Sequence, residues 1–327
     1  MKIIFNLFDT GLGNNGGSHT LVRSANTLVS LGHDVTIVDS VPNCYSWSPF
    51  KFKHLVVKNV NEFPNGDVVI ATGIGSLKTT NECKIDKKFM WIRGWETWKI
   101  PEDQLVKTLK QSPTVKLVNG LCLQNKLKKF DIESTIVRPG YDFDEINPLN
   151  FRQHNEKIVI GGLFNKGKKR ENKRTEWIIN VFDKLEKDVT CKDFELWMMS
   201  SEGQCPEATV FMYNPTSRDK NFFYNKVDIW LATSELEGLH LAPAEAMMTE
   251  CCVVGTNAEM AGTQDYLIDK ETGLVSNNDF ISFYKCVEDA VFDPTLRRLV
   301  GKMGKDKISE IGDRNQNMRK MMEILQK

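Results

Sequence analysis

Short apolar segments alternate with longer segments of helical periodicity along this chain, and the pattern starts twice. Residues 3–8 predict a buried strand, residues 19–31 predict an amphipathic helix, and Gly32 ends that helix before a second strand at 35–38. Further strands are predicted at 67–72, 88–92, 157–160, 194–199, 209–212, 228–232 and 252–255. Strands that alternate with helices in this way are typical of parallel α/β sheets.

The length of 327 residues is enough for two domains, each with its own hydrophobic core. The pattern starts again at residue 157, and residues 138–142 contain a Pro-Gly turn suited to a linker. Open α/β sheets bind ligands beyond the carboxyl ends of their strands. Two such domains that face each other therefore predict a deep cleft.

Charge, cysteine usage and hydropathy narrow the class of protein. Forty-three basic residues balance forty-three acidic ones, so nucleic-acid binding stays open but is not indicated by the net charge. The eight cysteines are scattered without C-x-x-C or zinc-type spacing, and we expect reduced thiols and no metal site. No apolar run reaches the ~20 residues of a membrane span. We expect a cytoplasmic protein without a transmembrane segment, with peripheral contact to a membrane surface left open.

The most informative segment covers residues 234–248, between a buried strand at 227–232 and another at 251–256. We expect Glu237 in a loop and Glu245 in the first turns of a helix that begins near Pro243, since proline is favoured at the start of a helix. The N-terminus of such a helix offers free N–H groups and positive potential, which suit a diphosphate.

Glu237 and Glu245 form an E-x7-E pair, and here the sequence resembles the family 4 retaining glycosyltransferases of the GT-B fold. The resemblance continues through residues 255–259 and 265–275. Upstream it includes residues 173–182, Gly16-Gly17 and residues 32–38. It therefore spans nearly the whole chain in the family's order. It implies an α/β protein of GT-B fold, with two Rossmann-like domains whose parallel sheets face across a cleft.

On this basis we expect an N-terminal, acceptor-side domain over residues 1–145. A C-terminal helix at about 312–327 is expected to return to that domain, because residues 315–325 carry apolar side chains at helical spacing. Residues 146–311 are expected to form the domain that binds the nucleotide sugar.

The resemblance also implies roles for individual residues. Glu237 would bind sugar hydroxyls of the donor, Glu245 would bind the ribose, and Lys173 would neutralise the diphosphate. The catalytic candidates are Glu237, Lys173 and Arg93. The donor-binding candidates are Gly16, Gly17, Gly162, Arg170, Gly238, Leu239, His240 and Glu245, with the backbone N–H groups of Leu239 and His240 close to the sugar and phosphate.

Glycosyl transfer expels a diphosphate, so the site needs fixed cations and N–H donors where negative charge develops. If Lys173 and the backbone supply them, no metal is needed. The sequence departs from the family in two places. Gly162 stands where the family has the arginine of G-R-L, so Arg170 or Lys169 becomes the candidate cation, and His240 replaces the second glycine of E-G-F-G-L.

Residues 91–98 resemble the branch of the family with a Q/R-G-x-E-x-W motif. Arg93 and Glu96 are therefore candidates for contact with the acceptor or a phosphate. Trp95 and Trp98 are candidates for stacking on a sugar acceptor, with buried aromatic packing as the alternative for at least one of them.

Gly11, Gly13 and Gly16 form a G-x-G-x-x-G, followed by Asp39 at the end of the second strand, which alone would indicate a nicotinamide dinucleotide. Polar residues before the first glycine and an Asn pair in the loop favour a diphosphate loop instead. The basic stretch at 165–174 is compatible with a solvated loop or with contact to an anion.

We therefore predict a retaining, metal-independent and cofactor-free hexosyltransferase-like enzyme. It would move a sugar from a UDP- or GDP-linked donor to an acceptor hydroxyl, with a glycan favoured and a modified DNA base or a protein as alternatives. A catalytically silent nucleotide-sugar-binding protein is the alternative of another class, because the departures touch the site. An NAD-dependent oxidoreductase is the remaining one.

Overall fold

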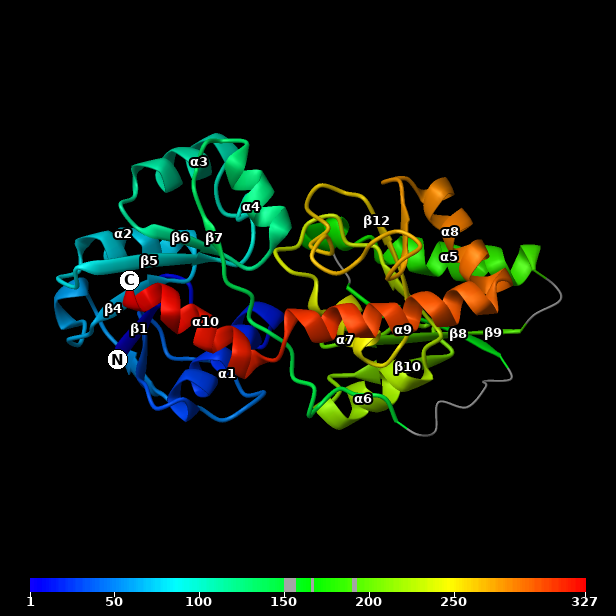
Figure 1. The fold of residues 1–327 in the computed structure, drawn as a ribbon, viewed down its shortest axis with the longest axis horizontal. Coiled ribbons are helices and arrows are strands. Elements are labelled where there is room, and N and C mark those ends of the chain that lie inside the picture. Colours follow the sequence, from blue (N-terminus) through cyan, green and yellow to red (C-terminus); the bar gives the residue numbers. More distant parts are fainter. Residues whose placement is uncertain (150–156, 166–167, 190–192) are drawn as a thin grey trace. The chain divides into compact units, whose positions relative to one another are not determined.

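The computed structural model describes residues 1–149, 157–165, 168–189 and 193–327, without the side chains of 168–170. The chain divides into two compact units (Figure 1): Met1–Gly140 with Asp313–Lys327, and Tyr141–Gly312. Each unit contains one parallel sheet, so the predicted α/β class with two Rossmann-like domains is confirmed.

The N-terminal unit has a seven-stranded sheet in the order β3-β2-β1-β4-β5-β6-β7. Its strands are β1 (Lys2–Asn6), β2 (Asp34–Asp39), β3 (Lys53–Val56), β4 (Val68–Ala71), β5 (Lys87–Ile92), β6 (Val115–Val118) and β7 (Thr135–Ile136). Its helices are α1 (Gly16–Ser30), α2 (Ile74–Glu82), α3 (Glu102–Gln111), α4 (Leu121–Lys128) and α10 (Arg314–Gln326), with a short 3-10 turn η1 (Val60–Glu62).

Both faces of this sheet are buried, because successive strand residues point to opposite sides. Ile3 and Phe5 of β1 join a core with α1 and α10, whereas Ile4 packs on the other face with residues that follow α2. Helix α10 lies beside α1 (Figure 1) and contributes four apolar side chains to the first core. They are Met318, Met321, Met322 and Leu325.

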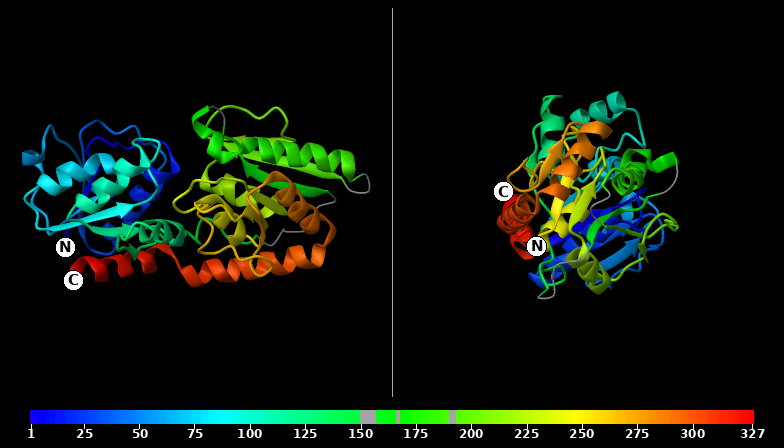
Figure 2. Two further views of the ribbon diagram at one scale, coloured as in Figure 1. Left: turned by 90° about the horizontal axis from the view of Figure 1, so that it is seen from above. Right: turned by 90° about the vertical axis from the view of Figure 1, so that its right-hand side faces the viewer.

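The C-terminal unit has a six-stranded sheet in the order β10-β9-β8-β11-β12-β13. Its strands are β8 (Ile158–Leu163), β9 (Phe194–Ser200), β10 (Val210–Tyr213), β11 (Ile229–Ala232), β12 (Cys252–Thr256) and β13 (Leu274–Ser276). Its helices are α5 (Thr175–Asp188), α6 (Ser217–Lys226), α7 (Leu241–Met248), α8 (Phe280–Phe292) and α9 (Pro294–Ile311), and the 3-10 segment η2 (Lys168–Lys173) precedes α5. The last helices, α9 and α10, are separated by Gly312 and Asp313 and are coloured orange to red in Figure 2.

Alternate residues of β9 again face two cores. Leu196 and Met198 pack with α5 and α8, whereas Trp197 and Met199 pack with α6 and α7. Helices therefore cover both faces of the sheet, and the polar groups that could bind a ligand lie in the loops at its edges.

Some boundaries differ from the predictions. Helix α1 begins at Gly16 rather than at residue 19, because the Asn15 side chain accepts a hydrogen bond from the Ser18 N–H and starts the helix earlier. Helix α7 begins at Leu241, two residues before Pro243. Strands β3, β6, β7 and β13 had not been predicted at all.

Gly301 inside α9 provides a test of this packing. A Cβ atom at this position would lie 2.3 Å from the Glu250 carbonyl oxygen. Alanine normally favours a helix over glycine by about 1 kcal/mol, but here the clash with backbone outweighs that gain. We expect Gly301→Ala to lower the thermal midpoint by several degrees in circular dichroism, and Lys302→Ala, at an exposed neighbouring position, to leave it unchanged. A midpoint of Gly301→Ala at or above that of the wild type would contradict this packing.

Candidate active site

Three neighbouring strands of the C-terminal unit, β8, β11 and β12, end at the same edge of the sheet. Backbone hydrogen bonds tie together the loops that follow them. These bonds run from the N–H of Glu235 to Asn172 (2.9 Å), of Glu237 to Met260 (2.7 Å) and of His240 to Gly262 (3.0 Å). The loops therefore form one connected frame for the side chains described below.

Gly262 allows this close approach of two loops. Its φ of +71° is a conformation that L-residues rarely adopt, and a Cβ atom would lie 2.7 Å from the Cβ of Glu237. A glycine is therefore required where the loop after β12 passes under Glu237.

Lys173 and Glu237 form an ion pair in this frame, with 2.5 Å between Nζ and Oε1. Both side chains are about four-fifths buried, with 20% and 19% exposed. Burial raises the pKa of Glu237, but the charges of His240 and Lys173 and the hydrogen bond from Lys173 outweigh it, so that the net shift is downward. Since His240 is neutral at pH 7, as described next, Lys173 is the cation that stabilises the carboxylate there.

His240 is buried at the start of α7, and its Nε2 lies 3.7 Å from the same oxygen of Glu237. Burial lowers the pKa of His240 to about 4, so the imidazole is neutral at pH 7. Its Nδ1 is buried without a hydrogen-bond partner among the described residues. Its backbone N–H is bonded to Gly262, so it does not point freely at a ligand as the resemblance implies. The N–H groups of Leu241 and Ala242, in the first turn of α7, have no intrahelical acceptor.

Glu245 lies on α7 and faces α6. It accepts hydrogen bonds from the Tyr224 hydroxyl (2.8 Å) and the Lys220 ammonium group (3.3 Å). Burial and the nearby Glu245 carboxylate raise the pKa of Tyr224 well above its ordinary value. Tyr224 and Lys220 are not among the predicted site residues, although their i, i+4 spacing places them on one face of α6.

A second ion pair, also absent from the sequence analysis, lies beside the first. The Arg174 guanidinium contacts the Glu235 carboxylate and donates to the Asn278 side chain at 2.5 Å. It also lies over the Trp177 ring, 4.5 Å from the centroid. Arg174 is therefore held by partners different from those of Lys173.

The remaining donor-binding candidates of the C-terminal unit lie after β8 and in the loop between β11 and α7. A Cβ atom at Gly162 would lie 2.6 Å from Cδ1 of Ile178, so this glycine lets α5 pack on the sheet. The side chains of Arg170 and Lys169 lie outside the described residues. Gly238 and Leu239 lie in the loop between β11 and α7, and the Leu239 side chain is buried.

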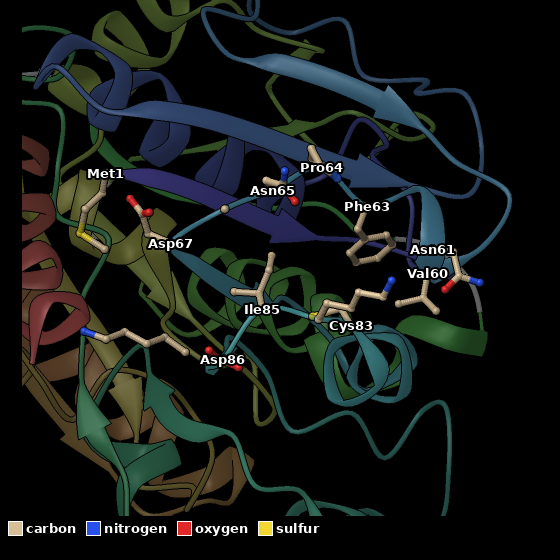
Figure 3. Close-up of a pocket in the computed structure, with 13 residues that line it drawn as sticks. Met1, Val60, Asn61, Phe63, Pro64, Asn65, Asp67, Cys83, Ile85 and Asp86 are labelled. Atoms are coloured by element: carbon tan, nitrogen blue, oxygen red, sulfur yellow. The ribbon is translucent and has the colours of Figure 1, made fainter.

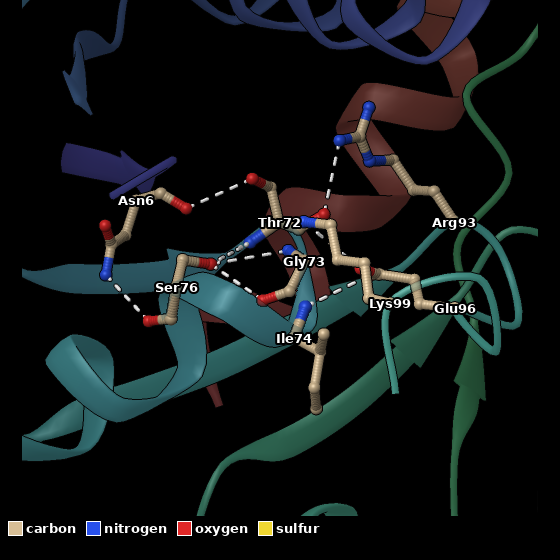
Figure 4. Close-up of polar contacts among 8 residues, drawn as sticks. All are labelled: Asn6, Thr72, Gly73, Ile74, Ser76, Arg93, Glu96 and Lys99. Carbon is tan, nitrogen blue, oxygen red and sulfur yellow. Dashed lines mark hydrogen bonds and ion pairs between the residues drawn. The ribbon is translucent and has the colours of Figure 1, made fainter. Parts of the chain in front are cut away.

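In the N-terminal unit, Gly16 and Gly17 form the first turn of α1, and Arg93 follows β5. The Arg93 guanidinium donates to the carbonyl oxygen of Gly17. It also donates to the carbonyl oxygen of Thr72 at 3.2 Å (Figure 4). Burial lowers the pKa of Arg93 to about 10, against the opposing effect of Glu96, and the group stays cationic at neutral pH. Arg93 thus links the start of α1 to the residue after β4. These two bonds give it a structural role in addition to any contact with a phosphate.

Glu96 and Trp95, the acceptor candidates, are both buried. The Glu96 carboxylate accepts from the Ile74 N–H at 3.0 Å and lies 3.7 Å from Lys99 (Figure 4), while burial raises its pKa. The Trp95 ring stacks on Phe130 and is only 3% exposed, so its position is that of a packing residue and not of a platform for a sugar.

The glycine motif near the N-terminus leads into α1. Helix α1 begins at Gly16, after a loop in which Gly11 has a φ of +75°. The Asp39 carboxylate accepts hydrogen bonds from the N–H groups of Ser40 and Val41 at 2.8 and 3.4 Å. Both bonds are accepted by Oδ1, which thus stabilises the turn after β2, while Oδ2 is buried without a hydrogen-bond partner among the described residues.

A pocket of about 700 Å³ lies in the N-terminal unit (Figure 3). Met1, Asp67 and Lys87, at the amino ends of β1, β4 and β5, line it together with Phe63 and Ile85. It therefore lies at the edge of the sheet opposite to Arg93 and Gly17.

Among the described residues, no helix is both long and apolar enough to cross a bilayer, and no three His, Cys, Asp or Glu side chains cluster as a metal site.

Comparisons with known proteins extend these observations. The sequence model of the family described as "Glycosyl transferases group 1" matches residues 158–293. The alpha-1,3/1,6-mannosyltransferase ALG2 of Mus musculus is 26% identical over 116 residues, which are 36% of this chain and 28% of that protein. The match to this curated relative thus spans less than a third of its length.

Solved structures share the complete fold. Sucrose-phosphate synthase of Thermosynechococcus elongatus superposes with a TM-score of 0.80 at 12% identity, over 100% of this chain and 98% of that chain. Anabaena HepE in complex with UDP-glucose gives a TM-score of 0.78 at 13% identity, over 100% and 99% of the two chains.

These comparisons define what the chain is similar to: its two units have the GT-B fold, and residues 158–293 resemble the glycosyl transferases group 1 family. The matched segment lies within the C-terminal unit and includes β8, η2, α7 and the ion pairs of Lys173, Arg174 and Lys220.

The low pKa of His240 predicts a pH-dependent stability. Unfolded histidine titrates near pH 6.5 and His240 at about 4, so between these values only the unfolded chain takes up the proton. The contribution of neutral His240 to the free energy of unfolding is therefore fully present above about pH 6.5. It is lost as the pH falls toward 4, by up to about 3 kcal/mol. We expect the urea midpoint of His240→Asn to decrease less than that of the wild type over this range.

His33 and His54, whose pKa values burial also lowers, are present in both proteins and cancel in the difference. Parallel pH profiles for wild type and His240→Asn would show that the imidazole is not protected from protonation.

Proposed function

We propose that this protein transfers a sugar from a UDP- or GDP-linked donor to an acceptor hydroxyl, with retention of the anomeric configuration and without a metal ion. The observation that carries the proposal is the group at the ends of β8, β11 and β12, where Lys173, Glu237 and the start of α7 converge inside the matched domain. The match to a mannosyltransferase and the fold shared with a UDP-glucose complex support it.

In the proposed reaction, the bond between the anomeric carbon and the diphosphate breaks, and the acceptor oxygen forms a new bond on the same face of the sugar. A phosphate oxygen of the leaving group takes the proton of the acceptor hydroxyl. Lys173 and the N–H groups in the first turn of α7 stabilise the negative charge that develops on the diphosphate.

Glu237 would accept hydrogen bonds from donor-sugar hydroxyls and Glu245 from the ribose of the nucleotide. Tyr224 and Lys220 orient the Glu245 carboxylate, so Glu245 can accept further hydrogen bonds without rearrangement. In the N-terminal unit, Gly16 and Gly17 would let the backbone approach a phosphate, and Arg93 holds this turn in place. The acceptor is proposed to be a glycan hydroxyl.

Donor binding can be tested by thermal shift, because a ligand that binds only the folded state raises the midpoint. We expect one UDP- or GDP-sugar to stabilise the wild type, and Glu245→Ala to lose at least about two-thirds of that shift. Glu186→Ala removes an exposed carboxylate of α5 and serves as the matched control, with the full shift expected. Stabilisation by NAD(H) alone would overturn the proposal. Binding with neither sugar transfer nor donor hydrolysis would favour a silent nucleotide-sugar-binding protein.

Metal independence is tested separately with the donor identified in that panel. We expect turnover to be unchanged after treatment with EDTA and unaffected by added Mg²⁺ or Mn²⁺, because Lys173 and the α7 N-terminus would neutralise the diphosphate. Loss of turnover with EDTA and its recovery with a divalent cation would refute this part of the proposal.

A further inference from the structure

Lys173 and Glu237 bind each other when no donor is present. Both groups are assigned to the donor under the proposed function, on which this inference rests, yet without donor they bind each other at 2.5 Å. The Lys173 ammonium group has three N–H donors, but the short contact draws it and its charge toward Glu237. A diphosphate that binds Lys173 therefore competes with Glu237 for this cation.

Among the side chains that the structure describes, the nearest basic groups do not replace Lys173 as the cation beside Glu237. His240 contacts Glu237 but is neutral at pH 7, so it does not replace Lys173 as a cation. Arg174 follows Lys173 directly, but its guanidinium is held by Glu235, Asn278 and the Trp177 ring. The charges of Lys173 and Glu237 are opposite, so the Glu237 carboxylate weakens the attraction of Lys173 for a diphosphate.

The energetic consequence differs between two ligands. When Lys173 moves to a diphosphate, the Glu237 carboxylate, 19% exposed, loses its cationic partner. Removing one partner of a largely buried charge pair is costly because the other is left uncompensated. A nucleotide sugar returns hydrogen bonds from its hydroxyls to the carboxylate, whereas a free nucleoside diphosphate returns none.

We propose that Glu237 is a specificity-determining residue that selects the intact nucleotide sugar over the free nucleoside diphosphate by competing for Lys173. The same competition weakens the hold on the product after transfer, since the departing sugar takes its hydroxyls with it and Glu237 recovers Lys173. Glu237 thus acts on recognition of the donor and on release of the diphosphate.

The test is isothermal titration of UDP, GDP and their sugar conjugates, UDP-glucose and GDP-mannose, into the full chain. Glu237→Gln keeps the size of the side chain and removes the competing charge. We expect it to bind the preferred nucleoside diphosphate about three- to ten-fold more tightly and the matching nucleotide sugar at least about ten-fold more weakly. A variant that merely damaged the site would weaken both ligands.

Glu235→Gln is the matched control, because it changes the net charge equally but releases Arg174 instead of Lys173. We expect its affinity for the diphosphate to stay within about two-fold of the wild type. Equal tightening in both variants would show a general charge effect and overturn the inference. So would weaker or unchanged diphosphate binding by Glu237→Gln.

A double-mutant cycle adds a second readout. In a Lys173→Gln background the competition is absent, so adding Glu237→Gln should no longer tighten diphosphate binding. Persistent tightening there would overturn the inference. If Glu237→Gln does not fold, Glu237→Ser makes the same change of charge. A wild type that binds none of the four ligands would instead refute the proposed function, which separates the two failures.

Discussion

Every strand pairing described in the two sheets is parallel, and this constraint decides where chemistry can take place. Parallel strands covered by helices on both faces are largely apolar, so the charged groups that could meet a ligand gather in the loops at the strand ends. Since β8, β11 and β12 are neighbours that point the same way, their following loops meet. Lys173 and Glu237, 64 residues apart in sequence, come into contact for this reason.

The periodicity of apolar residues was sufficient to predict the α/β class, and the resemblance to the family 4 glycosyltransferases predicted the GT-B fold; both are confirmed. It could not reveal β6, because Lys116 interrupts a four-residue apolar run. The Lys116 ammonium group satisfies its buried position by donating to the carbonyl oxygens of Ser112 and Thr114, at 2.6 and 2.7 Å. Strands as short as β7 and β13 show no alternation of their own, and only pairing with a neighbour defines them.

The candidate site shows the same division between local and non-local information. Local signals predicted a loop at Glu237 and a helix at Glu245, and the structure has both. The contact of Glu245 with Tyr224 depends on how α6 packs against α7, which no short motif contains. Trp95 is a second residue whose role the sequence alone could not predict. A tryptophan beside a glutamate is compatible with stacking on a sugar and with core packing. Only its burial against Phe130 decides between the two.

Helix α10 makes the N-terminal unit discontinuous along the chain, and this has a consequence during synthesis. The surface on which Met318, Met321, Met322 and Leu325 pack belongs to strands and a helix that precede the whole C-terminal unit along the chain. That apolar surface stays uncovered until α10 has been synthesised, whereas the C-terminal unit, a continuous segment, is complete before then. Synthesis of the N-terminal unit therefore starts before that of the C-terminal unit, but its core is completed after it.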